Sequence, residues 1–407
     1  MTVQLSSLAT LLLLGSFLSP VSSSKIPAQA QVIDQKSFNV LETTLPPTEF
    51  NGKTPFVPPG STGDSLAQQP FHVYDEEFLK IIGEAPTLTR IAHSAKDPLY
   101  HEAVVWFKET DEVFFVQNAG ALNASTGLEK SAIIEKISLA EAAAVSNQSD
   151  AAGLVNVTTV ASSPMVLNPN GGTNYRGQII FAGEGQGDYK PPSLWVMNPK
   201  SPFNTTVILN NYFGRQFNSL NDVAIHPTSK DIYFTDTIYG YVQDFRPAPG
   251  LQDQIYRLNP ETGAVTVVAD GFDHPNGFTF SPDGKYAYVA DTGIESGFFG
   301  VNFTRPASIY RFDVKEDGTL DNRKTFAFVH IGAPDGIHCD SWGNVYAGCG
   351  DGVHVWNQSG KLIGKIYVGA TAANFNFAGT GRMVICAETN LYYATLAAAG
   401  NYVDSEM

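Results

Sequence analysis

Four short strings recur along this chain, and each places an oxygen-bearing side chain just before an apolar run typical of a β-strand. They are HEAVVW with Glu102, LNDVAI with Asn221, PNGFTF with Asn276 and PDGIHC with Asp335, and further starts at Asn170 and Asn374 extend the series. From Asn170 to Asp335 neighbouring anchors lie roughly 50 to 60 residues apart. A repeat of about 40 to 50 residues in β-rich sequence is typical of a propeller, so the looser spacing implies insertions. Each blade of such a ring is a small antiparallel sheet that cannot bury its faces alone. The six starts therefore predict an all-β chain folded as a six-bladed β-propeller.

Turn residues follow the first strand of a unit and precede a return strand. The predicted turns are Pro227–Asp231, Ser281–Lys285 and Ser341–Asn344. A content of 37 Gly and 24 Pro fits many tight turns. Helical patterns are confined to two short segments, Tyr74–Ile82 and Leu139–Val145.

The chain divides into three parts by composition. Residues 1–24 contain an apolar run at Leu8–Leu18 that has the length of a signal peptide and is too short to span a bilayer, which predicts secretion and no membrane anchor. Residues 25–69 form a Pro-rich N-terminal arm with no domain of its own. The arm could wrap the ring or supply the strand that closes it, and disorder of Thr43–Asp64 is the alternative. Residues 70–400 form the propeller domain.

Asn-x-Ser/Thr sequons support passage through the secretory pathway, although any single one can arise by chance. The predicted glycosylation sites are Asn123, Asn147, Asn156, Asn204, Asn302 and Asn357. Asn357 lies between two predicted strands, where a glycan would be accessible.

Three cysteines cannot build a disulfide framework. With the turn at Ser341–Asn344, Cys339 is predicted to face Tyr346, which leaves Cys349 roughly 10 Å away and beyond disulfide reach. We therefore expect buried free thiols, Cys386 included. The net charge of −15 and the scattered basic residues argue against nucleic acid or an anionic membrane as a partner.

The four anchors supply only oxygen atoms and two formal negative charges, which suits a hard divalent cation. Calcium is the natural candidate, because ligands from four separate blades make a wider cage than magnesium prefers. Zinc would require His and Cys ligands, and neither HExxH nor CxxC occurs. Asn-Gly and Asp-Gly are also strong hairpin signals, so each anchor has a purely structural explanation. Each unit already has a turn downstream, however, and a loop before the innermost strand points into the central channel.

Five strings together resemble the regucalcin/gluconolactonase family of six-bladed, calcium-dependent lactonases: HEAVVW, LNDVAIHP, YFTDTIYG, PNGFTFSPDG and PDGIHCD. Their sequences are similar to those of secreted fungal lactonohydrolases acting on aldonolactones and D-pantolactone, and the resemblance covers about Phe71 to Leu396. The resemblance implies that the metal ligands are Glu102, Asn221, Asn276 and Asp335, and that Asp335 is also the general base. The animal members carry an Arg two residues before the Asn that matches Asn221, where this chain has Ser219. Sugar-acid contacts inferred from those members therefore do not carry over.

The resemblance implies hydrolysis of a small-molecule lactone. The carbonyl oxygen would bind the ion, which acts as a Lewis acid, and water would attack while Asp335 accepts its proton. A carboxylate bound to calcium has a lowered pKa, so His101 and His338 are alternative proton acceptors. Strand alternation places His338 on the face opposite Asp335, and a structural role is the competing explanation for both histidines.

Four further residues are predicted substrate contacts: Asn170, Glu184, Asp236 and Tyr239. Core packing is the alternative for the tyrosine. The glycines around Glu184 resemble a dinucleotide-binding loop, but Lys190-Pro191-Pro192 follows where a helix should begin. Neither GxSxG nor a Walker A string occurs, which argues against an α/β serine hydrolase and a phosphate-loop NTPase.

Other classes of function stay open, because propellers also serve as binding scaffolds. The alternatives are a secreted, non-catalytic binding propeller and a metal-free enzyme of the strictosidine-synthase kind, and phosphotriester hydrolysis is a conceivable side activity. The sequence leaves the preferred lactone and the oligomeric state undetermined.

Overall fold

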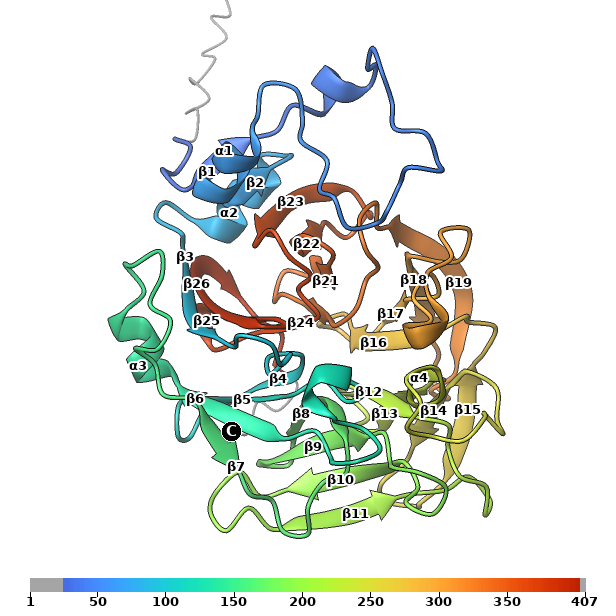
Figure 1. The fold of residues 1–407 in the computed structure, drawn as a ribbon. Coiled ribbons are helices and arrows are strands. Elements are labelled where there is room, and N and C mark those ends of the chain that lie inside the picture. The colour runs from blue at the N-terminus through green and yellow to red at the C-terminus, as the bar shows by residue number, and fades with distance from the viewer. Residues whose placement is uncertain (1–24, 403–407) are drawn as a thin grey trace, which may run out of the picture.

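Six sheets, each containing an antiparallel blade, stand around a central axis in the computed structural model (Figure 1). The structure describes residues 25–402, so the predicted signal peptide lies outside the described part. Each sheet contains a run of four strands, which confirms the prediction of an all-β, six-bladed propeller.

The blades follow one another along the chain. The first comprises β4 (Glu102–Phe107), β5 (Glu112–Val116), β6 (Ile134–Ser138) and β7 (Thr158–Val160), and the second β8 (Pro169–Tyr175), β9 (Gln178–Gly183), β10 (Ser193–Met197) and β11 (Thr205–Leu209). The third comprises β12 (Leu220–Ile225), β13 (Ile232–Asp236), β14 (Gln254–Leu258) and β15 (Val265–Ala269), and the fourth β16 (Pro275–Phe280), β17 (Tyr286–Asp291), β18 (Ser308–Val314) and β19 (Leu320–Phe328). The fifth comprises β20 (Ile337–Cys339), β21 (Val345–Cys349), β22 (Gly352–Trp356) and β23 (Leu362–Tyr367), and the sixth β24 (Asn374–Phe377), β25 (Thr380–Ala387), β26 (Asn390–Ala399) and β3 (Thr87–His93). The three predicted turns fall between the first and second strands of blades three, four and five.

The ring is closed by β3, which pairs antiparallel with β26 and forms the outer strand of the last blade. Strand closure from the N-terminal side was one of the alternatives, but the closing strand lies after the Pro-rich arm rather than within it. Hydrogen bonds between β3 and β26 join the two ends of the ring. The edge of β26 is therefore paired rather than exposed.

The arm extends the fifth blade outward. β1 (Ala30–Val32) pairs parallel with β2 (Phe71–Val73), and β2 pairs antiparallel with β23. Between them the arm crosses the propeller face, where Gly332 N–H donates to the Gly52 carbonyl at 2.9 Å and the Phe50 and Phe303 rings meet edge-on at 4.8 Å. The arm therefore wraps blades four and five.

Helices are few and short. α2 (Glu77–Ile82) and α3 (Leu139–Ala144) fall within the two predicted segments, whereas α1 (Gly63–Gln68) and α4 (Tyr239–Val242) were not predicted. The single-turn 3-10 segments are η1 (Gln35–Phe38), η2 (Leu122–Ala124) and η3 (Gly297–Phe299). α1 begins with a capping box between Thr62 and Ser65, and neither α1 nor α4 has an apolar periodicity that would mark a helix in the sequence. Among the described residues, none of the helices is long and apolar enough to cross a membrane.

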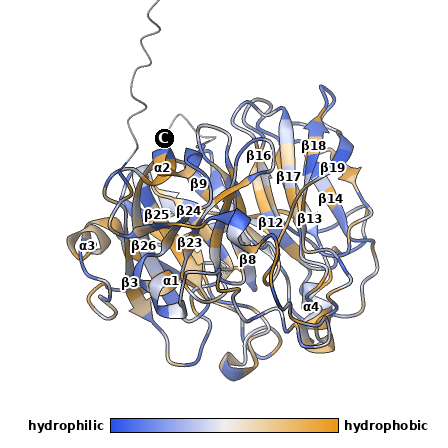
Figure 2. Cartoon of the chain, turned by 90° about the horizontal axis from the view of Figure 1, so that it is seen from above, coloured by the Kyte–Doolittle hydropathy of each residue, from blue (hydrophilic) through white to orange (hydrophobic). Residues whose placement is uncertain are grey.

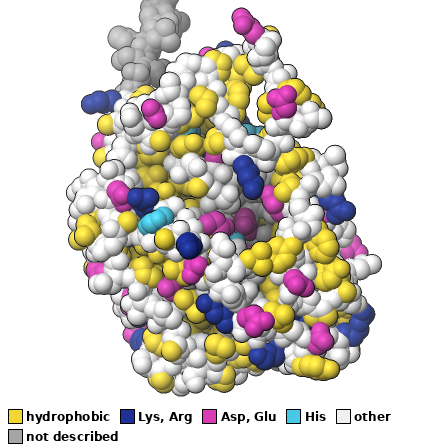
Figure 3. All heavy atoms as spheres, viewed as in Figure 1, with side chains coloured by type: hydrophobic (Ala, Val, Ile, Leu, Met, Phe, Trp, Pro, Cys, Tyr) yellow, Lys and Arg dark blue, Asp and Glu magenta, His cyan; other side chains and the backbone are white. Residues whose placement is uncertain are grey.

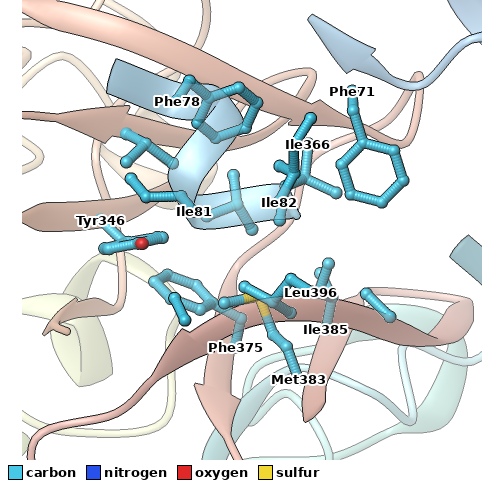
Figure 4. Close-up of a cluster of buried hydrophobic side chains, with 14 of the residues drawn as sticks. Phe71, Phe78, Ile81, Ile82, Tyr346, Ile366, Phe375, Met383, Ile385 and Leu396 are labelled. Carbon is cyan, nitrogen blue, oxygen red and sulfur yellow. The ribbon is translucent and has the colours of Figure 1, made fainter. Parts of the chain in front are cut away.

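The core lies within and between the blades, where apolar residues recur along the strands (Figure 2). One buried cluster joins the fifth blade to the sixth, and Figure 4 shows Phe78, Ile81 and Ile82 of α2 between Ile366 and Ile385. α2 therefore fills the space between the fifth and sixth blades with apolar side chains.

All three cysteines are buried and free, which confirms that prediction. The register beside them differs by one residue, because Cys339 pairs with Val345 and His338 faces Tyr346. Asp340 joins the turn, since its Oδ1 accepts the backbone N–H groups of Trp342 and Asn344 at 2.9 Å. The loop therefore has one residue more than the sequence indicated.

Candidate metal centre and active site

The six anchors stand at the starts of the innermost strands, as the repeat predicted. Five of them line one cavity of about 220 Å³ at the axis: Glu102, Asn170, Asn221, Asn276 and Asp335. Figure 3 shows acidic side chains gathered in a hollow near the middle of this face. The proposed metal ligands, which are spread over most of the sequence, therefore share one cavity.

Irregular pairing follows the anchors directly. The β4/β5 register shifts between Glu102 and Val105, and equivalent shifts occur after Pro169, Leu220 and Pro275. A bulge re-aims a side chain and bends the strand that carries it. The repeated shift thus explains why Glu102, Asn170, Asn221 and Asn276 line the cavity although their strands continue into the blade core.

After three of the anchors the next residue is glycine, because the next blade approaches it too closely for a side chain. An added Cβ on Gly277 would lie 2.2 Å from the Asp335 carbonyl oxygen, and one on Gly336 would lie 2.5 Å from Asn374 Cγ. Gly171 approaches the Asn221 carbonyl in the same way, at 2.6 Å. None of these three glycines has a positive φ, so the Asn-Gly and Asp-Gly pairs are not hairpin turns. They allow neighbouring anchors to approach closely.

The donor set fits a hard cation. Asn221 Oδ1 and Asn276 Oδ1 are buried without a hydrogen-bond partner, and the Glu102 side chain is also buried. Burial, together with the nearby Asp335 charge, raises the pKa of Glu102, and burial raises the pKa of Asp335 to about 6. Two carboxylates and two unpaired amide oxygens lining one cavity would be stabilised by a divalent ion.

The donor set is half carboxamide, which distinguishes it from acid-rich or histidine-rich metal sites. Within residues 25–402, no group of three or more His, Cys, Asp or Glu side chains is arranged to hold a metal ion. Calcium accepts amide and carboxylate oxygens alike, so this composition does not conflict with a calcium site.

Two asparagines support the donors. Asn374 Nδ2 donates a hydrogen bond to Glu102 Oε2, and Asn170 Nδ2 donates to the Asn221 carbonyl at 3.1 Å. Asn170 thus lines the cavity, as predicted for a substrate contact, while its amide group also fixes the neighbouring anchor.

His101 lies in the cavity beside a residue that the sequence did not reveal. Its Nδ1 is 3.0 Å from Glu388 Oε1, and the Asn118 amide lies 3.2 Å from the ring. Burial alone would lower the pKa of His101, but the Glu388 carboxylate, together with Glu102 and Asp335, raises it to about 10. A protonated ring paired with Glu388 would suit a proton donor better than a base.

Glu184 and Tyr239 both line the cavity. Glu184 Oε1 accepts the Ser219 hydroxyl at 2.8 Å, and burial raises the pKa of Glu184 to about 7. Tyr239 stands on α4 with its buried hydroxyl unpaired, so it is not simply a packed core residue.

Asp236 does not reach the cavity. Its carboxylate accepts the backbone N–H groups of Asn218 at 3.1 Å and Ser219 at 2.9 Å. Asp291 binds Asp273 and His274 in the same way in the next blade, at 3.1 and 2.9 Å. The predicted substrate contact is wrong, because this repeated aspartate fixes the loop that carries an anchor.

His338 also lies outside the cavity. It lines a small polar space deeper in the channel and packs edge-on against Phe375, with ring centroids 5.3 Å apart. Burial lowers the pKa of His338 to about 4. Its predicted catalytic role is wrong, because the chain direction after Asp335 carries the next residues away from the anchors.

Several cavity residues were missed by the sequence analysis: Asn118, Gln243, Thr292, Glu295 and Glu388. Thr292 and Glu388 directly follow the second strands of their blades, as Glu184 does. In an antiparallel blade the second strand ends at the rim where the first begins. The position just after each predicted return strand was therefore the available signal.

The predicted glycosylation sites differ in accessibility. Asn123, Asn147, Asn156, Asn204 and Asn302 are exposed, whereas Asn357 is half-buried and donates to the Glu77 carboxylate at 3.1 Å. Asn357 is thus less accessible than the other five, and modification of all six stays a prediction.

The fold and the axial cavity define a six-bladed β-propeller with a polar site where its innermost strands begin. A family model described as the SMP-30/Gluconolactonase/LRE-like region matches residues 101–389, and the chain belongs to that family.

Two relatives agree with this assignment, and a solved structure agrees with the fold. The lactonohydrolase oryL of Aspergillus oryzae is 35% identical over 205 residues, which are 47% of this chain and 46% of that protein. The lactonohydrolase oryH of the same organism is 27% identical over 349 residues, which are 69% of this chain and 70% of that protein. The chain thus spans less than half of oryL and about two thirds of oryH. A gluconolactonase structure from Xanthomonas campestris superposes with a TM-score of 0.62 at 22% identity, covering 80% of this chain and 94% of that one.

Proposed function

We propose that this protein is a secreted, calcium-dependent lactonohydrolase that opens aldonolactones or pantolactone to the hydroxy acid. The observation that carries the proposal is the convergence of Glu102, Asn221, Asn276 and Asp335 on one cavity, with both asparagine Oδ1 atoms unpaired. The names of the two Aspergillus relatives support the reaction class.

The four anchors would hold the ion. Calcium bound there would supply Lewis-acid polarisation of the lactone carbonyl. Asn374 and Asn170 would keep Glu102 and Asn221 oriented while substrate enters. Magnesium is the weaker candidate, since it demands a smaller octahedron than donors from four blades provide.

Proton transfer would be divided between Asp335 and His101. Water forms the new bond to the carbonyl carbon and gives a proton to Asp335, while the bond from that carbon to the ring oxygen breaks. His101, held protonated by Glu388, would donate to the departing ring oxygen. Exchange with solvent then restores both residues, and the product is the open hydroxy acid.

Export through the secretory pathway belongs to the same proposal. It rests on the apolar run at Leu8–Leu18 and on the sequons. The site is expected to take a small-molecule lactone, with neither nucleic acid nor membrane as a partner.

A panel of γ- and δ-lactones tests the reaction, assayed with calcium and after exhaustive chelation with metal content measured. We expect hydrolysis that chelation abolishes and calcium restores. Hydrolysis by protein verified to be metal-free would favour a strictosidine-synthase-like mechanism. Absence of hydrolysis of every lactone, with calcium bound, would favour a non-catalytic binding propeller.

A further inference from the structure

The cavity wall contains more negative charge than a bound cation would neutralise. Its acidic side chains are Glu102, Glu184, Glu295, Asp335 and Glu388, and no Lys or Arg is among its described lining residues. A divalent ion would balance Glu102 and Asp335, and His101 pairs with Glu388. Glu184 and Glu295 then provide the remaining charge.

The two remaining carboxylates differ in their surroundings. Glu295 lies within the field of Lys53 on the arm, which opposes the rise in pKa that burial gives Glu295. Glu184 is buried, its hydrogen-bond partner is the uncharged Ser219, and the cation that acts on it is His101, which is already paired with Glu388. An anionic group bound beside Glu184 would therefore be repelled by its carboxylate.

Hydrogen bonds fix the orientation of Glu184. Gly240 N–H donates to Ser219 Oγ at 3.0 Å, and Ser219 Oγ–H donates to Glu184 Oε1 at 2.8 Å. Because Ser219 already accepts from a backbone N–H, its own proton is directed at the carboxylate. Oε1 is thus engaged, and Oε2 is left to accept a hydrogen bond from a ligand in the cavity.

We infer that Glu184 is a specificity-determining residue, which accepts a hydrogen bond from a hydroxyl of a neutral hydroxylactone and rejects lactones bearing a carboxylate or phosphate. The inference rests on the proposed lactone hydrolysis and names the substrate class of that site. A hydroxyl satisfies the buried acceptor, whereas an anionic substituent would bring a like charge to it. The cations of the cavity, the bound ion and His101, would already be paired with Glu102, Asp335 and Glu388. A serine at position 219 orients the acceptor and adds no charge, where an arginine would supply a cation.

The test compares glucono-δ-lactone with its 6-phosphate, which share a ring and differ in charge. Assays are buffered above about 7, the value to which burial raises the pKa of Glu184. For the wild-type protein we expect kcat/KM to favour the neutral lactone by at least about 100-fold. Glu184→Gln keeps the shape of the side chain and removes the charge, and should narrow this ratio by about tenfold, mainly through KM of the phosphate.

Two further variants complete the experiment. Glu316→Gln removes the same charge from an exposed turn and should leave the ratio unchanged. Ser219→Ala frees the Glu184 side chain and should raise KM for the neutral lactone, which keeps the inference testable if Glu184→Gln does not fold. Calcium affinity, measured by titration, should be the same in all three variants.

The outcomes separate the two proposals. Hydrolysis of neither lactone, with calcium bound, contradicts the proposed function itself. Hydrolysis of both lactones with similar kcat/KM, or an unchanged ratio in Glu184→Gln, overturns the role of Glu184 and leaves lactone hydrolysis standing.

Discussion

Asn374 holds Glu102 across the junction where the sixth blade meets the first, by a hydrogen bond from its Nδ2 to Oε2 of the carboxylate. The two residues are 272 positions apart in the chain. We expect Asn374→Ala to weaken calcium binding by about 10- to 100-fold, because the carboxylate loses the donor that orients it. Isothermal titration with calcium measures the change.

Asn376 provides the matched control for that variant. It lies on the same strand, and its Nδ2 donates to the Val104 carbonyl at 2.8 Å rather than to an anchor. Asn376→Ala should lower stability and leave calcium affinity nearly unchanged. Equal losses of affinity in both variants would contradict the orienting role of Asn374.

Asn221 tests the donor set directly. Asn221→Ala removes a buried oxygen that has no protein partner, so calcium affinity and lactone hydrolysis should both fall by on the order of 100-fold or more. Asn221→Asp restores an oxygen at the same position and should recover calcium binding. If Asn221→Ala binds calcium and hydrolyses lactones like the wild-type protein, the site assignment fails.

Gly277 tests the contact between blades four and five. An alanine Cβ would lie 2.2 Å from the Asp335 carbonyl oxygen, so the Asp335 loop must shift. We expect Gly277→Ala to cost about 1–3 kcal/mol of stability and to reduce calcium affinity. Gly250→Ala is the control, because no atom lies within 4 Å of its added Cβ. Unaltered calcium affinity in Gly277→Ala would show that the close approach does not matter to the site.

Calcium removal should lower the melting temperature. A ligand that binds only the folded state stabilises it by about 2.7 kcal/mol at 100 times its Kd, so chelation should shift Tm downward by several degrees. Differential scanning calorimetry with and without chelator measures the shift. Asn221→Ala should show almost no calcium-dependent shift, and an equally large shift in that variant would point to calcium binding elsewhere.

Burial of His72 should make the stability of the protein depend on pH, independently of the cavity. It is buried beside Tyr367, accessible at only 2%, and its Nε2 lies 3.0 Å from the Leu66 carbonyl. Burial lowers the pKa of His72 to about 4, from about 6.5 in an unfolded chain. Between these values the unfolded state binds more protons, so this contribution is complete above about pH 6.5 and is lost as the pH falls towards 4.

Denaturant unfolding at a series of pH values checks this expectation. The stability advantage of the wild-type protein over His72→Gln should shrink by up to about 3 kcal/mol between neutral pH and pH 4. Parallel stability profiles for the two proteins would contradict it.

Much of the fold was predictable because a blade is specified locally. The runs after Asn221, Asn276 and Asp335, with the turns that follow them, predicted the first two strands of three blades. The strand that closes the ring was not predictable in this way, because no sequence motif in β3 identifies β26 as its partner. The pairing depends on ring geometry, which brings the two ends of the propeller together.

The candidate site was predictable to the extent that its residues share the repeat. Asp236 and Tyr239 lie three residues apart in one string, but Asp236 binds backbone N–H groups while Tyr239 lines the cavity on α4. Residue type and spacing do not distinguish these roles, because the direction of each side chain is set by a strand end and a helical turn that only the folded chain defines.

The sequence by itself determined the number of blades and the oxygen donors, because the repeat places one polar anchor before each apolar strand. Only the tertiary structure decided which other groups share the cavity with those anchors and what orients them. Glu388 reaches His101, and Ser219 orients Glu184, because loops distant in the chain end at the same rim of the ring. The physical reason is that hydrophobic periodicity is encoded within each blade, whereas the contacts of the cavity arise from closing six blades around one axis.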